Sequence, residues 1–145
     1  YGLIEEYQME DAEIVLVALG STAGTAKEAV DVARDEGKKA GLIRIRVFRP
    51  FPYDKIINAL KGKKVVLVLD RSDTMSNMGG PAFVEIRSAM YEIPEKPLMK
   101  NYIYGLGGRD IFVEDILEAI EEGEKILKEG GLINLIKKYE GWPQI

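Results

Sequence analysis

The sequence contains no cysteine and no histidine among its 145 residues. The absence of cysteine excludes disulfide bonds, thiolate chemistry and the thiolate ligands of iron–sulfur clusters. The absence of histidine excludes serine–histidine triads, and the two absences together exclude the usual zinc sites. Carboxylates, lysine, tyrosine and hydroxyl groups are the side chains that remain for chemistry.

The sequence also lacks an excess of basic residues and any long apolar run. Its formal net charge is −4 and its isoelectric point is about 5.0, which argues against a nucleic-acid-binding surface. No apolar stretch approaches the length of a transmembrane helix, and no charged-then-apolar leader opens the sequence. We therefore expect a soluble, cytoplasmic protein.

The composition is that of one globular domain, with 46% hydrophobic and 30% charged residues. We expect residues 1–12 to be a lead-in segment and residues 13–145 to form a single domain. Asparagine and glutamine are few relative to Lys, Arg and Glu, which resembles the composition of thermophile proteins. Because the first residue is Tyr1 and not methionine, we expect a processed chain or a piece of a longer one.

The domain is organised around residues 13–28, EIVLVALGSTAGTAKE. Ile14–Leu19 is a continuous apolar run, which is typical of a strand covered by helices on both faces of a parallel sheet. Gly20 and Gly24 then predict a turn, because glycine adopts backbone angles that a β-carbon resists. The stretch thus predicts a buried strand followed by a tight turn.

The residues after this turn predict the start of a helix. Thr25 and Glu28 have the spacing of a capping box, so we expect the helix to begin near Ala26. Backbone N–H groups at a helix N-terminus can bind a phosphate or carboxylate. The candidate anion-binding residues here are Gly20, Ser21, Thr22, Gly24 and Thr25.

Two interpretations of this turn stay open. The sequence GSTAG matches neither the glycine-rich dinucleotide fingerprint nor a Walker loop, because no Gly-Lys-Ser/Thr follows it. Any strand-to-helix turn requires the same small and capping residues. The turn is therefore either an ordinary connection or the site of a stand-alone anion- or nucleotide-binding module.

The rest of the chain alternates between apolar strands and amphipathic helices. The expected strands are Ile14–Leu19, Ala40–Phe48, Val65–Leu69 and Leu98–Tyr104. The expected helices are Ala26–Glu36, Tyr53–Leu60, a helix from Pro81, Val113–Leu127 and a short last helix, Leu132–Tyr139. Four mostly parallel strands with helices between them predict an α/β fold, a three-layer sandwich.

Three arginines are further candidates for an anion site or an interface. Arg46 and Arg49 lie near the end of the second expected strand, where they can meet a carboxylate or a phosphate. Arg109 follows a pair of glycines after the fourth strand. Each arginine has a structural alternative, namely a solvated face, a subunit contact or the bracing of a turn.

No arrangement of residues predicts catalysis or metal binding by this chain. Asp70 and Asp73 lack a third ligand at a defined spacing, and no two carboxylates are placed as a general acid and base. Two non-periodic segments, 73–80 and 105–110, follow strands, where α/β sheets usually bind ligands or partners. Taken alone, the residues indicate a scaffold or accessory domain.

Five segments in succession resemble a known family: ALGSTAGTAKEAV, IRIRVFRPFP, VVLVLDRS, GGP and IYGLGGRDI. They are similar to the C-terminal, transketolase C-terminal-like part of the α subunit of 2-oxoacid:ferredoxin oxidoreductases, and most similar to pyruvate:ferredoxin oxidoreductase. The resemblance covers nearly the whole chain. The RPFP segment occurs widely in transketolase-like C-terminal domains, whereas IYGLGGRDI is more specific to the ferredoxin-linked α subunits.

The resemblance implies an enzyme that oxidatively decarboxylates a 2-oxoacid with CoA to an acyl-CoA and reduces ferredoxin. Pyruvate is the leading substrate, ahead of 2-oxoisovalerate and 2-oxoglutarate. The family uses thiamine diphosphate, Mg²⁺ and iron–sulfur clusters, which are held by other domains and subunits. The resemblance therefore implies a domain that binds no cofactor, is inactive alone and contacts the thiamine-binding and ferredoxin-like subunits.

The residues that match the family's segments are expected to be structural, and none is expected to be catalytic. They are Gly20, Ser21, Gly24 and Thr25 in the first turn, Arg49 and Pro50 in the bend, Asp70 and Arg71 after the third strand, and Gly107, Gly108, Arg109 and Asp110.

Overall fold

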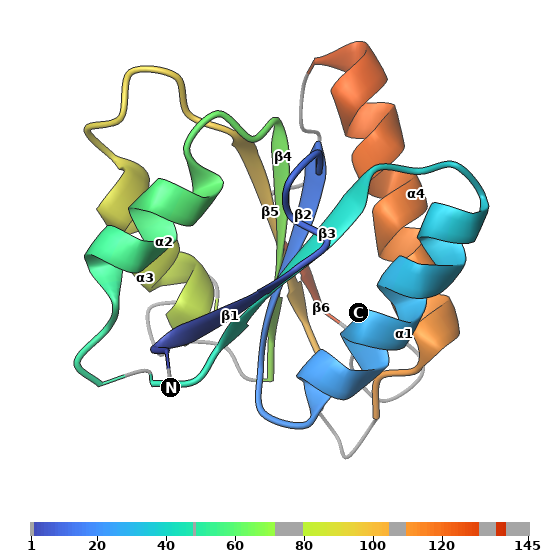
Figure 1. The fold of residues 1–145 in the computed structure, drawn as a ribbon, viewed down its shortest axis with the longest axis horizontal. Coiled ribbons are helices and arrows are strands. Elements are labelled where there is room, and N and C mark those ends of the chain that lie inside the picture. Colours follow the sequence, from blue (N-terminus) through green and yellow to red (C-terminus); the bar gives the residue numbers. More distant parts are fainter. Residues whose placement is uncertain (1, 48, 72–79, 105–109, 131–135, 139–145) are drawn as a thin grey trace.

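The computed structural model describes residues 2–47, 49–71, 80–104, 110–130 and 136–138. For residues 136–138 it describes the backbone alone. These residues form six strands and four helices (Figure 1). In chain order the elements are β1 (Ile4–Tyr7), β2 (Ile14–Leu19), α1 (Thr22–Asp35), β3 (Ala40–Ile45), α2 (Tyr53–Leu60), β4 (Val65–Asp70), α3 (Pro81–Met90), β5 (Leu98–Ile103), α4 (Val113–Glu129) and β6 (Ile136–Lys138).

The six strands form one sheet in the order β1-β3-β2-β4-β5-β6. Strand β1 runs antiparallel to β3, and the other neighbouring strands are parallel. Helices α1 and α4 cover one face of the sheet, and helices α2 and α3 cover the other (Figure 1). The structure confirms the predicted three-layer α/β sandwich with a mostly parallel sheet.

The central strands β2 and β4 are buried on both faces, as their continuous apolar sequences predict. Ile14, Leu16 and Ala18 face the core under α1 and α4, whereas Val15 and Val17 face the core under α2 and α3. Successive side chains of a strand point to opposite faces, so a strand between two helix layers has to be apolar at every position.

Helix α1 begins four residues earlier than predicted, at Thr22 and not at Ala26. The expected capping box does not form, because Thr25 already lies inside the helix. Gly20 adopts a left-handed backbone with φ of 59°, so it alone makes the turn that two glycines were expected to share. Gly24 has no such conformation and is an ordinary residue of the first helical turn.

The N-terminal segment contributes a strand that the sequence did not predict. Strand β1 pairs antiparallel with β3 and covers what would otherwise be the edge of the parallel sheet. Just beyond the paired residues Ile4 and Ile45, the backbone N–H groups of Arg46 and Val47 both donate hydrogen bonds to the carbonyl of Leu3. Strand β3 ends at Ile45, earlier than the predicted Phe48.

The prediction of a last helix over 132–139 is wrong where the structure describes this segment. Ile136–Lys138 forms strand β6, which pairs parallel with Asn101–Ile103 of β5. The pairing satisfies the outer backbone groups of β5, and this tertiary gain outweighs the local helical pattern.

The carboxyl ends of the parallel strands lie together at the lower edge of the sheet in Figure 1. The chain crosses from β2 to β3 on one face and from β3 to β4 on the other, so the order reverses between β2 and β4. The expected loops 73–80 and 105–110 fall almost entirely outside the described residues. No helix in the described part of the chain is long and apolar enough to cross a membrane.

Candidate functional site

A cavity of about 400 Å³ opens at the carboxyl edge of the sheet, between the ends of β2 and β4. It is lined by Leu19, Gly20, Ser21, Thr22, Leu69, Asp70, Arg71, Pro81 and Tyr104. In open α/β sheets, ligands bind outside the carboxyl ends of the strands, at the point where the strand order reverses. The cavity occupies this position, so we treat it as the candidate site.

One wall of the cavity is built around Asp70, which is 3% exposed. Its carboxylate accepts hydrogen bonds from the backbone N–H groups of Ala82 (2.9 Å) and Phe83 (3.0 Å) at the start of α3. The Asn101 side chain donates a third bond of 3.0 Å to the same carboxylate. Asp70 therefore caps α3 and fixes the helix to the end of β4.

Asn101 completes this buried network from strand β5, and its residue is fully buried. Its amide group donates to the carbonyl of Val68 at 2.9 Å and accepts from the N–H of Gly80 at 2.7 Å. A β-carbon on Gly80 would lie 2.2 Å from the Asp70 side chain, so the close approach requires glycine. The Gly-Pro start of α3 is thus dictated by its contact with Asp70.

The opposite wall joins the start of α1 to the end of β5. The hydroxyl groups of Thr22 and Tyr104 form a hydrogen bond, and both residues are buried. The Arg71 guanidinium lies over the Tyr104 ring, 5.9 Å from its centroid, within the range of a cation–π contact. An exposed arginine therefore stands at the mouth of the cavity beside two buried hydroxyl groups.

The structure brings together only part of the predicted anion site. Gly20, Ser21 and Thr22 line the cavity, whereas Gly24 and Thr25 do not. Two N–H groups of the turn are already used inside it: Ala23 donates to Gly20 and Gly24 donates to Ser21. The turn offers an anion fewer donors than a free helix N-terminus would.

Of the predicted arginines, Arg46 and Arg49 do not line the cavity. Arg46 forms an ion pair of 3.0 Å with Glu5 of β1. Arg49 is 67% exposed and lies 3.6 Å from Glu85 of α3. The same glutamate accepts a hydrogen bond of 2.8 Å from the Tyr53 hydroxyl, which raises the pKa of Tyr53. Arg109 lies outside the described residues.

Sequence reasoning missed Tyr104 and did not foresee what Asp70 does. For Asp70, the available signal was a polar residue at the end of an apolar strand, followed by Gly80-Pro81 at a helix start. Tyr104 gave no signal, because its partner Thr22 is 82 positions away in the chain.

The described residues do not fit a site for Mg²⁺ or an iron–sulfur cluster. Among them there is no group of three or more acidic side chains placed to hold a metal ion. The oxygens of Asp70 are engaged by the N-terminus of α3 and by Asn101. Cysteine is absent from the whole sequence, so the chain supplies no thiolate ligand for a cluster.

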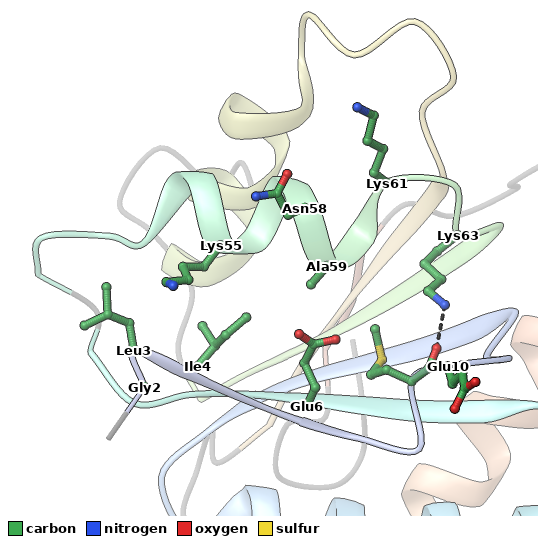
Figure 2. Close-up of a pocket in the computed structure, with 11 residues that line it drawn as sticks. Gly2, Leu3, Ile4, Glu6, Glu10, Lys55, Asn58, Ala59, Lys61 and Lys63 are labelled. Atoms are coloured by element: carbon green, nitrogen blue, oxygen red, sulfur yellow. Dashed lines mark hydrogen bonds between the residues drawn. The ribbon is translucent and has the colours of Figure 1, made fainter.

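A second cavity, of about 490 Å³, lies between β1 and α2 (Figure 2). Lys55, Asn58 and Lys61 line it from the helix side, and Glu6 and Glu10 line it from the β1 side. Charges of both signs lie around its rim, and Lys63 donates to the carbonyl of Met9 at 2.6 Å. This mixture favours no single class of ligand.

The sequence was compared with known protein families and curated proteins. Residues 12–116 match the family model described as "Pyruvate:ferredoxin oxidoreductase core domain II". The chain is 47% identical over 141 residues to the pyruvate synthase subunit PorA of Thermotoga maritima, covering 97% of this chain and 35% of the relative. It is 40% identical over 137 residues to the ketoisovalerate oxidoreductase subunit VorA of Pyrococcus horikoshii, covering 94% of this chain and 34% of the relative.

Solved structures with the same fold include two that match most of the chain. One is a 2-oxoglutarate:ferredoxin oxidoreductase from Magnetococcus marinus, with 22% identity and a TM-score of 0.62 over 85% of this chain and 20% of the other. The other is a split-gene transketolase, with 14% identity and a TM-score of 0.63 over 83% of this chain and 42% of the other. At these identities the likeness shows the fold, which is transketolase-like as the sequence predicted.

The chain spans about a third of the length of the curated relatives it matches. The family model covers more than half of the chain and includes the first turn, the Asp70–Arg71 segment and Tyr104. The chain belongs to the pyruvate:ferredoxin oxidoreductase core domain II family, as its sequence segments indicated.

Proposed function

We propose that this chain is a non-catalytic assembly domain of the α subunit of a 2-oxoacid:ferredoxin oxidoreductase. The observation that carries the proposal is that a pyruvate synthase subunit matches 97% of this chain at 47% identity, over 35% of its own length. In this proposal residues 13–145 form one domain, and residues 1–12 lead into it and add strand β1 to its sheet. The whole enzyme, pyruvate synthase, oxidatively decarboxylates pyruvate with CoA to acetyl-CoA and CO₂ and reduces ferredoxin.

The contacts at the carboxyl edge support a structural role. The carboxylate of Asp70 holds the start of α3, and the hydroxyl groups of Thr22 and Tyr104 bind each other. A general base has to be within reach of a substrate proton with a free lone pair. Asp70 is already engaged by backbone N–H groups, so it acts as a brace that keeps the edge of the domain rigid.

The cofactors belong to other parts of the enzyme in this proposal. Thiamine diphosphate, Mg²⁺ and the iron–sulfur clusters are held by other domains and subunits. The described residues of this chain offer no cluster of acidic side chains for Mg²⁺, and its sequence has no cysteine for an iron–sulfur cluster. This domain contacts the thiamine-binding and ferredoxin-like parts, and the assembled cytoplasmic enzyme transfers electrons to ferredoxin. Arg46 and Arg49 remain candidates for these interfaces.

Pyruvate is the proposed substrate because a pyruvate synthase subunit has the higher identity of the two relatives described, 47% against 40% for the ketoisovalerate oxidoreductase subunit. The difference is small, so 2-oxoisovalerate is the second candidate. The 2-oxoglutarate enzyme shares 22% identity and therefore supports the fold alone.

The stand-alone anion- or nucleotide-binding module is not favoured. The family match extends over the turn that this reading required. Two N–H groups of the turn, on Ala23 and Gly24, already donate to carbonyl groups of the turn itself.

The proposal is tested by assembling the enzyme with and without this chain. The chain is co-expressed with the remaining parts of the oxidoreductase, and reduction of methyl viologen is measured with pyruvate, 2-oxoisovalerate and 2-oxoglutarate. We expect CoA-dependent turnover, fastest with pyruvate, only when the chain co-purifies with the other parts. Turnover by the purified chain alone would contradict a non-catalytic role, and failure to co-purify would contradict the assembly role.

A further inference from the structure

The carboxyl-edge cavity has the size and lining of a small-molecule site. Its volume of about 400 Å³ is within the range of about 300–1,000 Å³ that ligand pockets occupy. Leu19, Leu69 and Pro81 give it apolar walls, and a few polar groups converge at one side.

Arg71 differs from the other arginines near this edge. Arg44, Arg46 and Arg49 each form an ion pair with a carboxylate. Arg71 has no carboxylate partner within the described part of the chain, and its guanidinium contacts the Tyr104 ring. A guanidinium over an aromatic ring is oriented by that ring, while the N–H groups in its plane remain able to bind an anion.

The ring beneath Arg71 is itself held in place. The Tyr104 hydroxyl is hydrogen-bonded to Thr22, and Tyr104 is 4% exposed. Two hydroxyl groups carry two protons, and their mutual bond uses one of them. The pair therefore has one further O–H donor for an acceptor in the cavity.

Asp70, the one acidic side chain among the described lining residues, does not oppose an anion at the mouth. Asp70 lies in the wall, but its oxygens accept from Ala82, Phe83 and Asn101. The positive end of the α3 dipole offsets its charge. A ligand would place its own charge at the exposed Arg71 and its apolar part against the inner walls.

We propose that this cavity binds a small organic carboxylate with an apolar body, with the carboxylate on Arg71. One guanidinium matches one carboxylate through two parallel hydrogen bonds. A phosphate with two charges would require more cations than Arg71, which is the one cation that the described residues contribute to this lining. The site is distinct from the assembly role, and its failure would leave that role untouched.

The test uses the full 145-residue chain and hexanoate as the probe, with hexanamide, acetate and inorganic phosphate for comparison. Titrations are followed by ¹H–¹⁵N NMR. We expect saturable shifts of the Leu69 and Tyr104 amides with hexanoate, with affinity at least about tenfold higher than for hexanamide, as for a charge-assisted bond. Acetate should bind more weakly than hexanoate, because it lacks the apolar body.

Variants assign the charge to Arg71. Arg71→Met should remove the preference for hexanoate over hexanamide, and Arg71→Lys should keep part of it. Arg87→Met is the matched control, because Arg87 also lies over a ring, 5.5 Å from the centroid of Phe83, but does not line the cavity. Equal binding of hexanoate and hexanamide, retention of the preference in Arg71→Met, stronger binding of phosphate, or no saturable binding at about 10 mM would each overturn the proposal.

Discussion

The Asn101 side chain donates a 3.0 Å hydrogen bond to the Asp70 carboxylate, and this buried pair joins neighbouring strands β4 and β5. The carboxylate also accepts from the N–H groups of Ala82 and Phe83 in α3. One side chain thereby fixes two strands and a helix at the edge that carries the cavity. Each of these donors is buried, so none has water as a ready substitute.

Replacement of Asp70 by alanine should strongly destabilise the domain. Asp70→Ala leaves the donors of Ala82, Phe83 and Asn101 without an acceptor, and buried unsatisfied groups cost about 1–3 kcal/mol each. We expect the free energy of unfolding, measured in urea at pH 7, to fall by about 3 kcal/mol or more. The control Asp35→Ala, at an exposed position near the end of α1, should change it by less than about 0.5 kcal/mol. A loss below about 1 kcal/mol for Asp70→Ala would show that the network is dispensable.

Two glycine-to-alanine replacements should have opposite effects. In Gly80→Ala the new β-carbon would lie 2.2 Å from Asp70, so the start of α3 has to move, and we expect a loss of about 2 kcal/mol or more. In Gly24→Ala the new β-carbon meets nothing within 4 Å inside α1. Alanine should therefore stabilise the helix by up to about 0.5 kcal/mol. Thermal midpoints check both, and destabilisation by Gly24→Ala would restore the predicted turn role of Gly24.

The ion pair between buried Lys100 and half-buried Glu122 should respond unequally to loss of its two members. The Lys100 side chain is 7% exposed and lies 2.7 Å from Glu122, which is 35% exposed. Glu122→Gln leaves a buried ammonium without its counter-charge, and we expect a loss of about 2 kcal/mol. Lys100→Met leaves a carboxylate that water still reaches, so we expect less than about 1 kcal/mol.

The double variant distinguishes charge burial from lost packing. With Lys100→Met in place, Glu122→Gln should cost little further stability, because the Lys100 ammonium that required the Glu122 counter-charge is gone. Additive losses in urea unfolding would contradict this coupling.

The ion pair between Arg34 and Asp11 should make stability depend on acid pH. Arg34 donates to both oxygens of Asp11, at 2.7 and 3.1 Å, and these bonds lower the pKa of Asp11. Because the folded pKa is below the unfolded one, the stabilisation is present above about pH 4 and is lost as the pH falls through the folded pKa. Asp11→Asn should flatten the decline of the thermal midpoint below about pH 4.

Substitution of Arg34, the partner of Asp11, checks that this ion pair causes the pH dependence. Arg34→Met should flatten the same part of the curve, and adding Asp11→Asn to it should change the curve no further. A decline as steep in Asp11→Asn as in the natural sequence would show that other carboxylates dominate this pH range.

The sequence predicted the elements whose patterns are local. Helix α2 has the predicted bounds, Tyr53–Leu60, because its apolar face and the prolines before it are adjacent in the chain. Strands β2 and β4 were evident from their continuous apolar runs, since burial on both faces requires one. The family was also evident, because its segments follow in order along the chain.

Strands β1 and β6 were decided by tertiary contacts. Whether Ile4–Tyr7 or Ile136–Lys138 becomes a strand depends on which sheet edge is free to pair with it, and such an edge exists only after folding. The candidate site was likewise decided by tertiary contacts. Thr22 and Tyr104 meet across 82 positions of sequence, and the distance in the chain hides the contact that shapes the cavity.

The sequence by itself therefore determined the fold class, the family and the absence of cysteine and histidine, which are properties of composition and local pattern. The tertiary structure decided that Asp70 is a brace, that Gly80 is required beside it and that Arg71 stands over Tyr104. The physical reason is the parallel sheet, whose strand ends come together at one edge although long crossovers separate them in the chain.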